Sequence, residues 1–137
     1  MQLTKLRRQI LELLLERSRP ARAYELIEAL KLQDSREIGP PTVYRALRFL
    51  IAQGLVSKIE SHNAYVPCAH PERQHDCLFF ICTRCGMSTE LEGHQVERLL
   101  SESAAALGFQ VARRVVEVEG TCARCSEVEA DGLVPMR

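Results

Sequence analysis

The sequence lacks any apolar run of the roughly 18 to 20 residues that a helix needs to cross a bilayer, although 46% of its 137 residues are hydrophobic. It also lacks an apolar N-terminal stretch behind basic residues, so a secretory signal is not indicated. We therefore expect a cytoplasmic protein without a membrane anchor. In a reducing cytosol, closely spaced cysteines more often hold zinc than form disulfides.

The sequence has no net charge either, because 18 lysines and arginines balance 18 aspartates and glutamates. Residues 1–58 nevertheless carry eleven basic and six acidic residues, a net charge of +5, whereas the rest of the chain carries seven and twelve, a net charge of −5. A basic N-terminal half is typical of a phosphate-binding module joined to an acidic partner domain. Chance clustering of the basic residues is the alternative.

Helical periodicity dominates the N-terminal half. Apolar spacing predicts amphipathic helices at 3–15 and 23–32, separated by a break at Arg19-Pro20-Ala21. A third helix is expected from Pro40-Pro41-Thr42 to about Gln53, with Thr42 helping to cap it and Gly54 ending it. We expect Val43, Leu47, Leu50 and Ile51 to face inward, and Tyr44, Arg45 and Arg48 to lie on the other face.

Two strand-like runs follow, at 55–59 and 64–67, and the polar turn 60–63 between them predicts a hairpin. Three helices and a hairpin make a winged helix-turn-helix, and a purely structural three-helix bundle is the alternative. The fold class is therefore α+β, with a winged-helix domain at 1–67 and a His/Cys-rich linker at 68–77.

The remaining residues, 78–137, predict a small α/β domain. Strands are expected at 78–82 and 110–118, with a helix at 96–107 that Gly108 stops. The tail 127–137 has little apolar content, and we expect it to be mobile.

Four cysteines form the most specific motif, as two CxxC pairs separated by 36 residues. Tetrahedral zinc favours four thiolates, and each CxxC turn directs two sulfurs toward one ion. Such a site leaves no open position for a substrate, so we predict a structural zinc site and no enzyme. A redox dithiol and two disulfides remain as alternatives. The predicted ligands are Cys82, Cys85, Cys122 and Cys125.

A second group mixes nitrogen, sulfur and carboxylate donors, which suits zinc better than a hard cation. His75 and Cys77 are two residues apart, so both side chains share a face if the segment is extended. His62 lies near the tip of the expected hairpin, where the residue opposite Cys68 would be near Ser57, and we expect it to be a turn residue. The alternative is a polar linker with free cysteines. The group comprises Cys68, His70, His75, Cys77 and Glu90.

The run PTVYRAL at 41–47, followed by Leu50 and GLV at 54–56, closely resembles the recognition-helix signature of the ferric-uptake-regulator family. The run FICTRCG at 80–86 resembles the zinc-ribbon strand of that family. With the second CxxC pair, the likeness covers residues 3–126. It implies a homodimer built by the second half, cytoplasmic location, and metal-dependent repression.

Within the family, the run ESHNAYVPC at 60–68 resembles the zinc-uptake branch. The resemblance implies repression of zinc-acquisition genes, with one structural and at least one regulatory zinc per chain. By that resemblance Cys68, His75 and Glu90 match sensor ligands, but Ser57 stands where some relatives have a histidine. Cys77 is our candidate for the missing ligand, with His70 behind it.

We expect the third helix to read double-stranded operator DNA. Arg45 and Arg48 can reach phosphates or guanine edges, Tyr44 a thymine methyl group or a phosphate, and the other basic residues phosphates. A symmetric dimer would present two such helices to a pseudo-palindromic site. The expected contacts are Thr42, Tyr44, Arg45, Arg48, Lys5, Arg7, Arg8, Arg22 and Lys58.

Three other functions remain open at this point. An iron- or peroxide-sensing regulator would differ in its metal and its chemistry. A zinc hydrolase would need an open coordination position and a base, for which Glu90 beside His75 is the candidate. A structural zinc adaptor would show no response to DNA.

Overall fold

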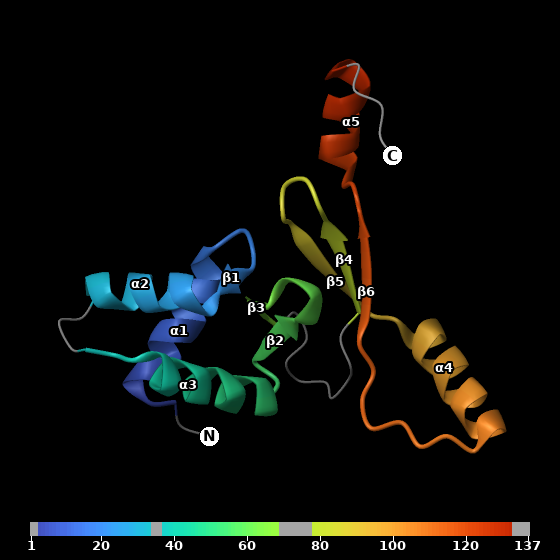
Figure 1. The fold of residues 1–137 in the computed structure, drawn as a ribbon, viewed down its shortest axis with the longest axis horizontal. Coiled ribbons are helices and arrows are strands. Elements are labelled where there is room, and N and C mark those ends of the chain that lie inside the picture. The colour runs from blue at the N-terminus through green and yellow to red at the C-terminus, as the bar shows by residue number, and fades with distance from the viewer. Residues whose placement is uncertain (1–2, 34–36, 69–77, 133–137) are drawn as a thin grey trace. The chain divides into compact units, whose positions relative to one another are not determined.

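The structure is a computed structural model that describes residues 3–33, 37–68 and 78–132. It divides into two compact units, residues 1–74 and 75–137. The first contains helices α1, α2 and α3 with a small sheet, and the second contains another small sheet with helices α4 and α5 (Figure 1). Among the described residues, no helix has both the length and the apolar character that crossing a membrane requires.

The helices of the first unit are α1 (Lys5–Glu16), α2 (Ala23–Gln33) and α3 (Pro40–Ala52). The Thr4 hydroxyl accepts a hydrogen bond of 3.3 Å from the backbone N–H of Arg7 and so caps α1. The expected cap of α3 by Thr42 is wrong. Gly39 is the N-cap, without a side-chain hydrogen bond. Prolines fill the first positions of α3, and a proline has no N–H that needs a cap.

The sheet of the first unit has the antiparallel order β1-β3-β2. The hairpin is confirmed, because β2 (Val56–Ile59) pairs with β3 (Ala64–Pro67) through the 3-10 turn Glu60–His62. The third strand, β1 (Ala21–Arg22), lies where the sequence predicted only a break. A strand of two residues has no periodicity, and it forms because β3 offers it a partner.

The register of the hairpin differs from the expected one. Ser57 pairs with Val66, and the N–H of Cys68 bonds to the carbonyl of Leu55 at 2.9 Å. Cys68 therefore lies opposite Leu55 and not near Ser57. His62 lies in the turn between the strands, as predicted.

The core of the first unit lies between the helices and the sheet. Val43, Leu47 and Leu50 are buried as predicted, at 0%, 1% and 0% exposure. Ile51 was expected to join them but is 37% exposed, and Ala46 is buried in its place at 5%. A stripe centred on positions 43, 47 and 50 turns toward position 46, and a small side chain there lets neighbouring elements approach.

The second unit contains the mixed sheet β5-β4-β6. Strand β4 (Leu78–Cys82) has the predicted bounds and pairs antiparallel with β5 (Ser88–Leu91) and parallel with β6 (Val116–Gly120). The predicted strand at 110–118 is wrong in its first half. Residues of β4 pair only with 116–120, so the preceding residues have no facing positions on β4.

Two helices complete the second unit. Helix α4 (His94–Leu107) ends at Gly108, whose φ of 69° is the left-handed cap that the sequence predicted. Helix α5 (Ala123–Gly132) corrects the expectation of a mobile tail from residue 127, since residues up to 132 are helical. Its low apolar content weakened the signal, and the helix follows directly from the second CxxC turn.

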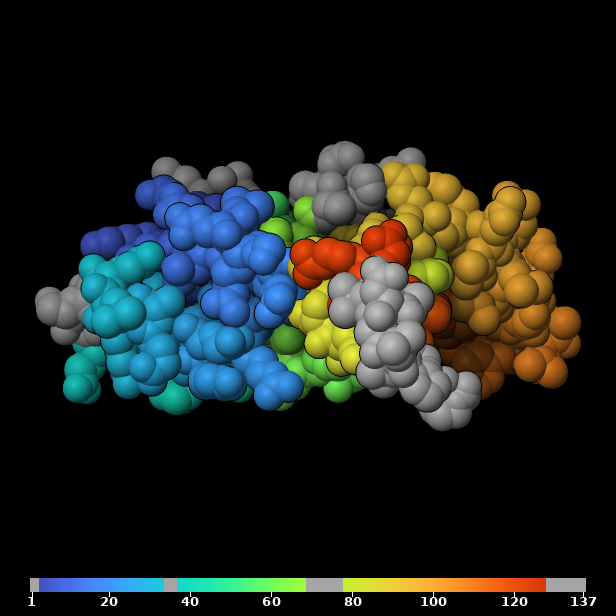
Figure 2. Space-filling model, turned by 90° about the horizontal axis from the view of Figure 1, so that it is seen from above, coloured from blue at the N-terminus to red at the C-terminus, as the bar shows by residue number. Residues whose placement is uncertain are grey.

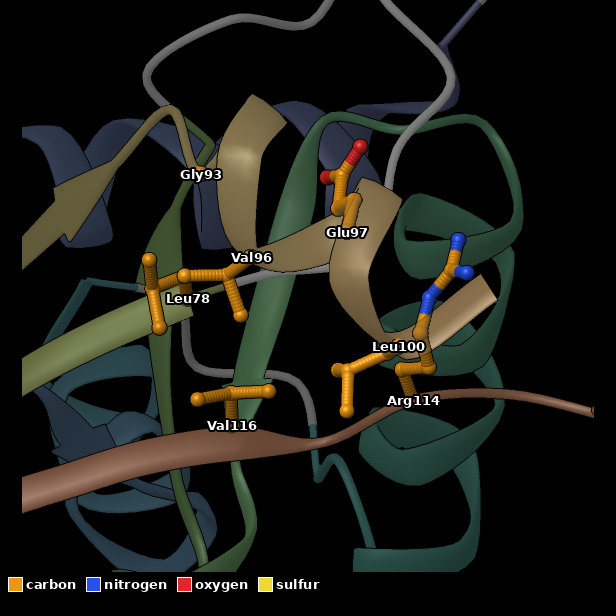
Figure 3. Close-up of a pocket in the computed structure, with 7 residues that line it drawn as sticks. All are labelled: Leu78, Gly93, Val96, Glu97, Leu100, Arg114 and Val116. Atoms are coloured by element: carbon orange, nitrogen blue, oxygen red, sulfur yellow. The ribbon is translucent and has the colours of Figure 1, made fainter. Parts of the chain in front are cut away.

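Helix α4 packs on one end of the sheet. Leu78 and Val116 of the sheet meet Val96 and Leu100 of the helix around a cavity of about 10 Å³, which leaves room for one water molecule at most (Figure 3). The surface of α4 remains largely exposed in gold in Figure 2, and Leu107 is 81% exposed.

Candidate metal centre and nucleic-acid interface

The four cysteines come from the ends of two paired strands. Cys82 ends β4 and Cys85 follows in a tight turn, in which the N–H of Gly86 bonds to the carbonyl of Cys82 at 2.9 Å. Gly86 has a φ of 80°, a conformation that favours glycine. Cys122 follows β6 and Cys125 lies in the first turn of α5.

Hydrogen bonds hold the two CxxC segments side by side. The backbone N–H and the hydroxyl of Thr83 both donate to the carbonyl of Gly120, at 2.8 and 3.2 Å. Gly120 pairs with Cys82 across the parallel strands. Residues that are 40 positions apart in the chain therefore meet at one end of the sheet, and the N–H of Cys122 donates to the Cys82 sulfur at 3.3 Å.

The geometry of the cluster fits a zinc ion. The four sulfur atoms all lie within 4.8 Å of one another, and the Cys85 and Cys122 sulfurs are 3.9 Å apart. A tetrahedral Zn–S distance of about 2.3 Å places neighbouring sulfurs about 3.8 Å apart. Cys82 is buried and the other three are half-buried. The donor set and the spacing therefore match a closed tetrahedral site.

The thiols of the cluster differ in acidity. The backbone N–H groups of Cys122 and Cys85 point at the Cys82 sulfur and lower its pKa to about 6. Hydrogen bonding with the Cys122 thiol, followed by burial, raises the pKa of Cys125 to about 12. One thiolate therefore forms easily while the crowded sulfurs resist further ionisation. A bound dication would neutralise this repulsion and favour all four thiolates.

The second metal-binding group falls only partly within the described residues. His70, His75 and Cys77 lie outside them. Cys68 is half-buried just after β3, and Glu90 is half-buried in β5, where it pairs with Phe79. The regulatory site thus stays a prediction.

Helix α3 presents its polar face outward, as predicted. Thr42, Tyr44, Arg45 and Arg48 are exposed, Tyr44 at 38%, while the opposite side of the helix packs into the core. The outward face therefore carries two guanidinium groups and a phenol within two helical turns. Such a face can reach base edges and phosphates.

The other predicted DNA contacts differ in their surroundings. Lys5, Arg8 and Arg22 are exposed. Lys58 is half-buried, with its ammonium 3.9 Å from the Glu60 carboxylate and 5.9 Å from the centre of the Tyr65 ring. Arg7 is also half-buried.

A groove beside α3 contains residues that the sequence reasoning missed. It is open, has a volume of about 410 Å³, and lies between the start of α2, the start of α3 and the hairpin turn. Tyr24 is 61% exposed at its edge, and an exposed aromatic in the first turn of a helix is the signal that could have identified it. The lining residues are Arg22, Ala23, Tyr24, Tyr44, Ser61, His62 and Asn63.

Comparison with known proteins identifies a family. The model of the Ferric uptake regulator family matches residues 1–119. A zinc uptake regulation protein of Escherichia coli (strain K12) is 41% identical over 129 residues, which cover 93% of this chain and 75% of that protein.

Solved structures are similar along nearly the whole chain. A zinc uptake regulator complexed with zinc and DNA has a TM-score of 0.90 at 40% identity, covering 95% of this chain and 87% of that one. The crystal structure of holo XcZur has a TM-score of 0.84 at 44% identity, covering 93% and 88%.

Proposed function

We propose a function from one premise: the chain belongs to the ferric uptake regulator family. It is a zinc-responsive transcriptional repressor that binds operator DNA as a zinc-loaded dimer and represses zinc-uptake genes. It works in the cytoplasm and is not an enzyme. The similar structure that holds both zinc and DNA, and the similar zinc uptake regulation protein, support the zinc-uptake branch.

One observation carries the DNA-binding function. Helix α3 buries Val43 and Leu47 while Tyr44, Arg45 and Arg48 remain exposed. Apolar packing thereby holds the helix rigidly and leaves its polar face available for a major groove. We propose that Thr42 and these exposed residues contact bases or nearby phosphates. Lys5, Arg8, Arg22 and Lys58 hold phosphates around them.

Selection of DNA from a randomised duplex library tests this function. The zinc-loaded protein is expected to enrich a pseudo-palindromic sequence, and the chelated protein is expected to enrich none. Enrichment that is independent of metal would contradict a zinc-responsive repressor. Enrichment with iron, or release by peroxide, would instead indicate an iron- or peroxide-sensing regulator.

Zinc at the four-cysteine site has a structural role in this proposal. Four thiolates fill the tetrahedron, so the ion has no position for a substrate or a reacting water. The chain's own residues supply the preorganisation: Thr83 joins the two CxxC segments, and backbone N–H groups favour the Cys82 thiolate. The ion would hold the ends of β4 and β6 together with the start of α5.

The homodimer follows from the apolar surface of the second unit. Phe80 of β4 is 50% exposed and Val118 of β6, its neighbour across the parallel pair, is 44% exposed. Leu99 and Phe109 are exposed at 62% and 67%. Apolar area of this extent is typical of an interface with another chain. We propose that 78–137 is the dimerisation domain, after the winged-helix domain 1–67 and the metal-binding linker 68–77.

The sensor in this proposal is a second zinc site with mixed ligands, Cys68, His75, Cys77 and Glu90. Its donors come from the end of the hairpin, the linker and β5. Zinc would fix the angle between the two winged domains of the dimer, and DNA would select the same arrangement. The affinities for metal and DNA are then reciprocally coupled, typically by about 1 to 3 kcal/mol.

Ser57 offers a sharp test of the ligand set. It is 5% exposed on β2, two residues from Leu55, the partner of Cys68, and so lies on the same face of the hairpin as Cys68. Cys77→Ser should weaken zinc-dependent DNA binding, and adding Ser57→His should restore part of it. If Cys77→Ser behaves like the wild type while His70→Ala does not, His70 is the fourth ligand. If Cys68→Ser keeps full zinc-dependent binding, the sensor lies elsewhere.

A further inference from the structure

We propose that Arg7 is a positioning residue for DNA binding, a role that rests on the proposed function. Its guanidinium stacks on Phe49 and thereby fixes the rotation of α3 against α1. The sequence suggested instead that Arg7 holds a phosphate. The structure separates Arg7 from its basic neighbours Lys5 and Arg8, which are exposed, whereas Arg7 is half-buried.

The stack is close and its backbone is anchored. The Arg7 Cζ atom lies 3.6 Å from the centre of the Phe49 ring. A guanidinium at this distance from an aromatic face gains both dispersion and electrostatic attraction. The N–H of Arg7 also donates to the Thr4 hydroxyl, so the cap of α1 fixes the origin of the side chain. Arg7 is thus held at both ends.

Phe49 is well placed to transmit this restraint. It is half-buried in α3 and packs against the main hydrophobic core. Arg45 precedes it by four residues, which places the two side chains on neighbouring turns of the same side of the helix. Arg48 immediately precedes Phe49. Fixing the Phe49 ring therefore also fixes the direction in which Arg45 and Arg48 project.

Small rotations of α3 matter for recognition. A rotation of about 10° moves a side-chain tip at a radius of about 6 Å by about 1 Å. Hydrogen bonds to base edges need donor–acceptor distances within a few tenths of an ångström, so such a shift weakens direct readout. Contacts with phosphates through flexible lysine and arginine side chains tolerate it better. Loss of the stack should thus reduce sequence discrimination more than general affinity.

The test uses the full-length zinc-loaded protein and two duplexes, one selected from a random library by the wild type and one of random sequence. The variants are Arg7→Met, Phe49→Leu and their combination, with Arg7→Lys as the conservative change and Arg8→Met as the matched control. Dissociation constants are measured on both duplexes over a range of salt concentrations. Thermal unfolding is measured without DNA.

Arg7→Met should bind the selected duplex about 2- to 5-fold more weakly. Its affinity for the random duplex and its salt slope should be unchanged. Phe49→Leu should have the same effect, and the double variant should be no worse than either single variant, because both remove one interaction. Arg7→Lys keeps a cation over the ring and should retain most of the discrimination. Arg8→Met should weaken both duplexes alike and lower the salt slope by about 0.9.

Two results would overturn the proposal while leaving the proposed function intact. Equal loss on both duplexes with a lower salt slope would make Arg7 a phosphate contact. A lower melting temperature with an unchanged ratio of the two affinities would make the stack merely structural. If the wild-type protein selects no duplex at all, the proposed function itself fails, and the role of Arg7 in DNA binding falls with it.

Discussion

Replacing Cys122 by serine removes one of the four thiolates that converge within 4.8 Å at the end of the β4–β6 pair. Formation of a structural zinc site can contribute on the order of 10 kcal/mol to folding. Among the described residues of the second unit, the buried hydrophobic side chains are Phe79, Ile81 and Cys82. Two large apolar side chains contribute about 3 to 6 kcal/mol. The core alone therefore cannot replace the metal site.

Cys122→Ser is thus expected to lose its tightly held zinc, to unfold in the second unit and to become monomeric. Zinc content after chelation, hydrogen exchange of the amides in residues 78–120, and sedimentation measure these three effects. Ser126→Ala is the matched control, since its hydroxyl lies one residue beyond the cluster and bonds to the Thr121 carbonyl at 3.4 Å. A Cys122→Ser variant that stays a dimer with wild-type protection and melting would refute the structural role of the site.

Three further predictions concern the turn after α4, the hairpin and the recognition helix. Gly108→Ala should destabilise the protein by about 1 kcal/mol because of its left-handed φ, whereas Gly120→Ala, which has open space and no positive φ, should not; equal unfolding curves would contradict this. Burial raises the pKa of Tyr65, so its stabilising effect is complete below pH 10.0 and is lost as the pH rises through the folded pKa. Comparing the alkaline unfolding of wild type and Tyr65→Phe checks it, and identical pH dependence would disprove it. Arg45→Ala should cost about 1 to 3 kcal/mol on the selected duplex and relax preference at one base pair per half-site. Lys5→Ala should weaken all duplexes alike, with a salt slope lower by about 0.9; equal loss on selected and random DNA for Arg45→Ala would remove it from the base contacts.

Local sequence patterns determined the elements whose information lies within a few residues. The spacing of Val43, Leu47 and Leu50 defines the buried side of α3, because residues three and four apart share a helix face. Gly108 marks the end of α4 because few residues other than glycine adopt its φ without strain. The two CxxC pairs likewise predicted their own convergence, since each spacing brings two sulfurs together and zinc chemistry favours four.

Tertiary structure decided the features that depend on partners far apart in the chain. Strand β1 exists because β3 pairs with it, and β6 begins only at Val116 because β4 offers no earlier partner. The stack of Arg7 on Phe49 joins residues 42 positions apart, and no local period encodes it. The sequence alone therefore determined which helices and metal ligands form. Only the packed structure decided which strands pair and which basic residue turns inward, because those choices depend on contacts between distant segments.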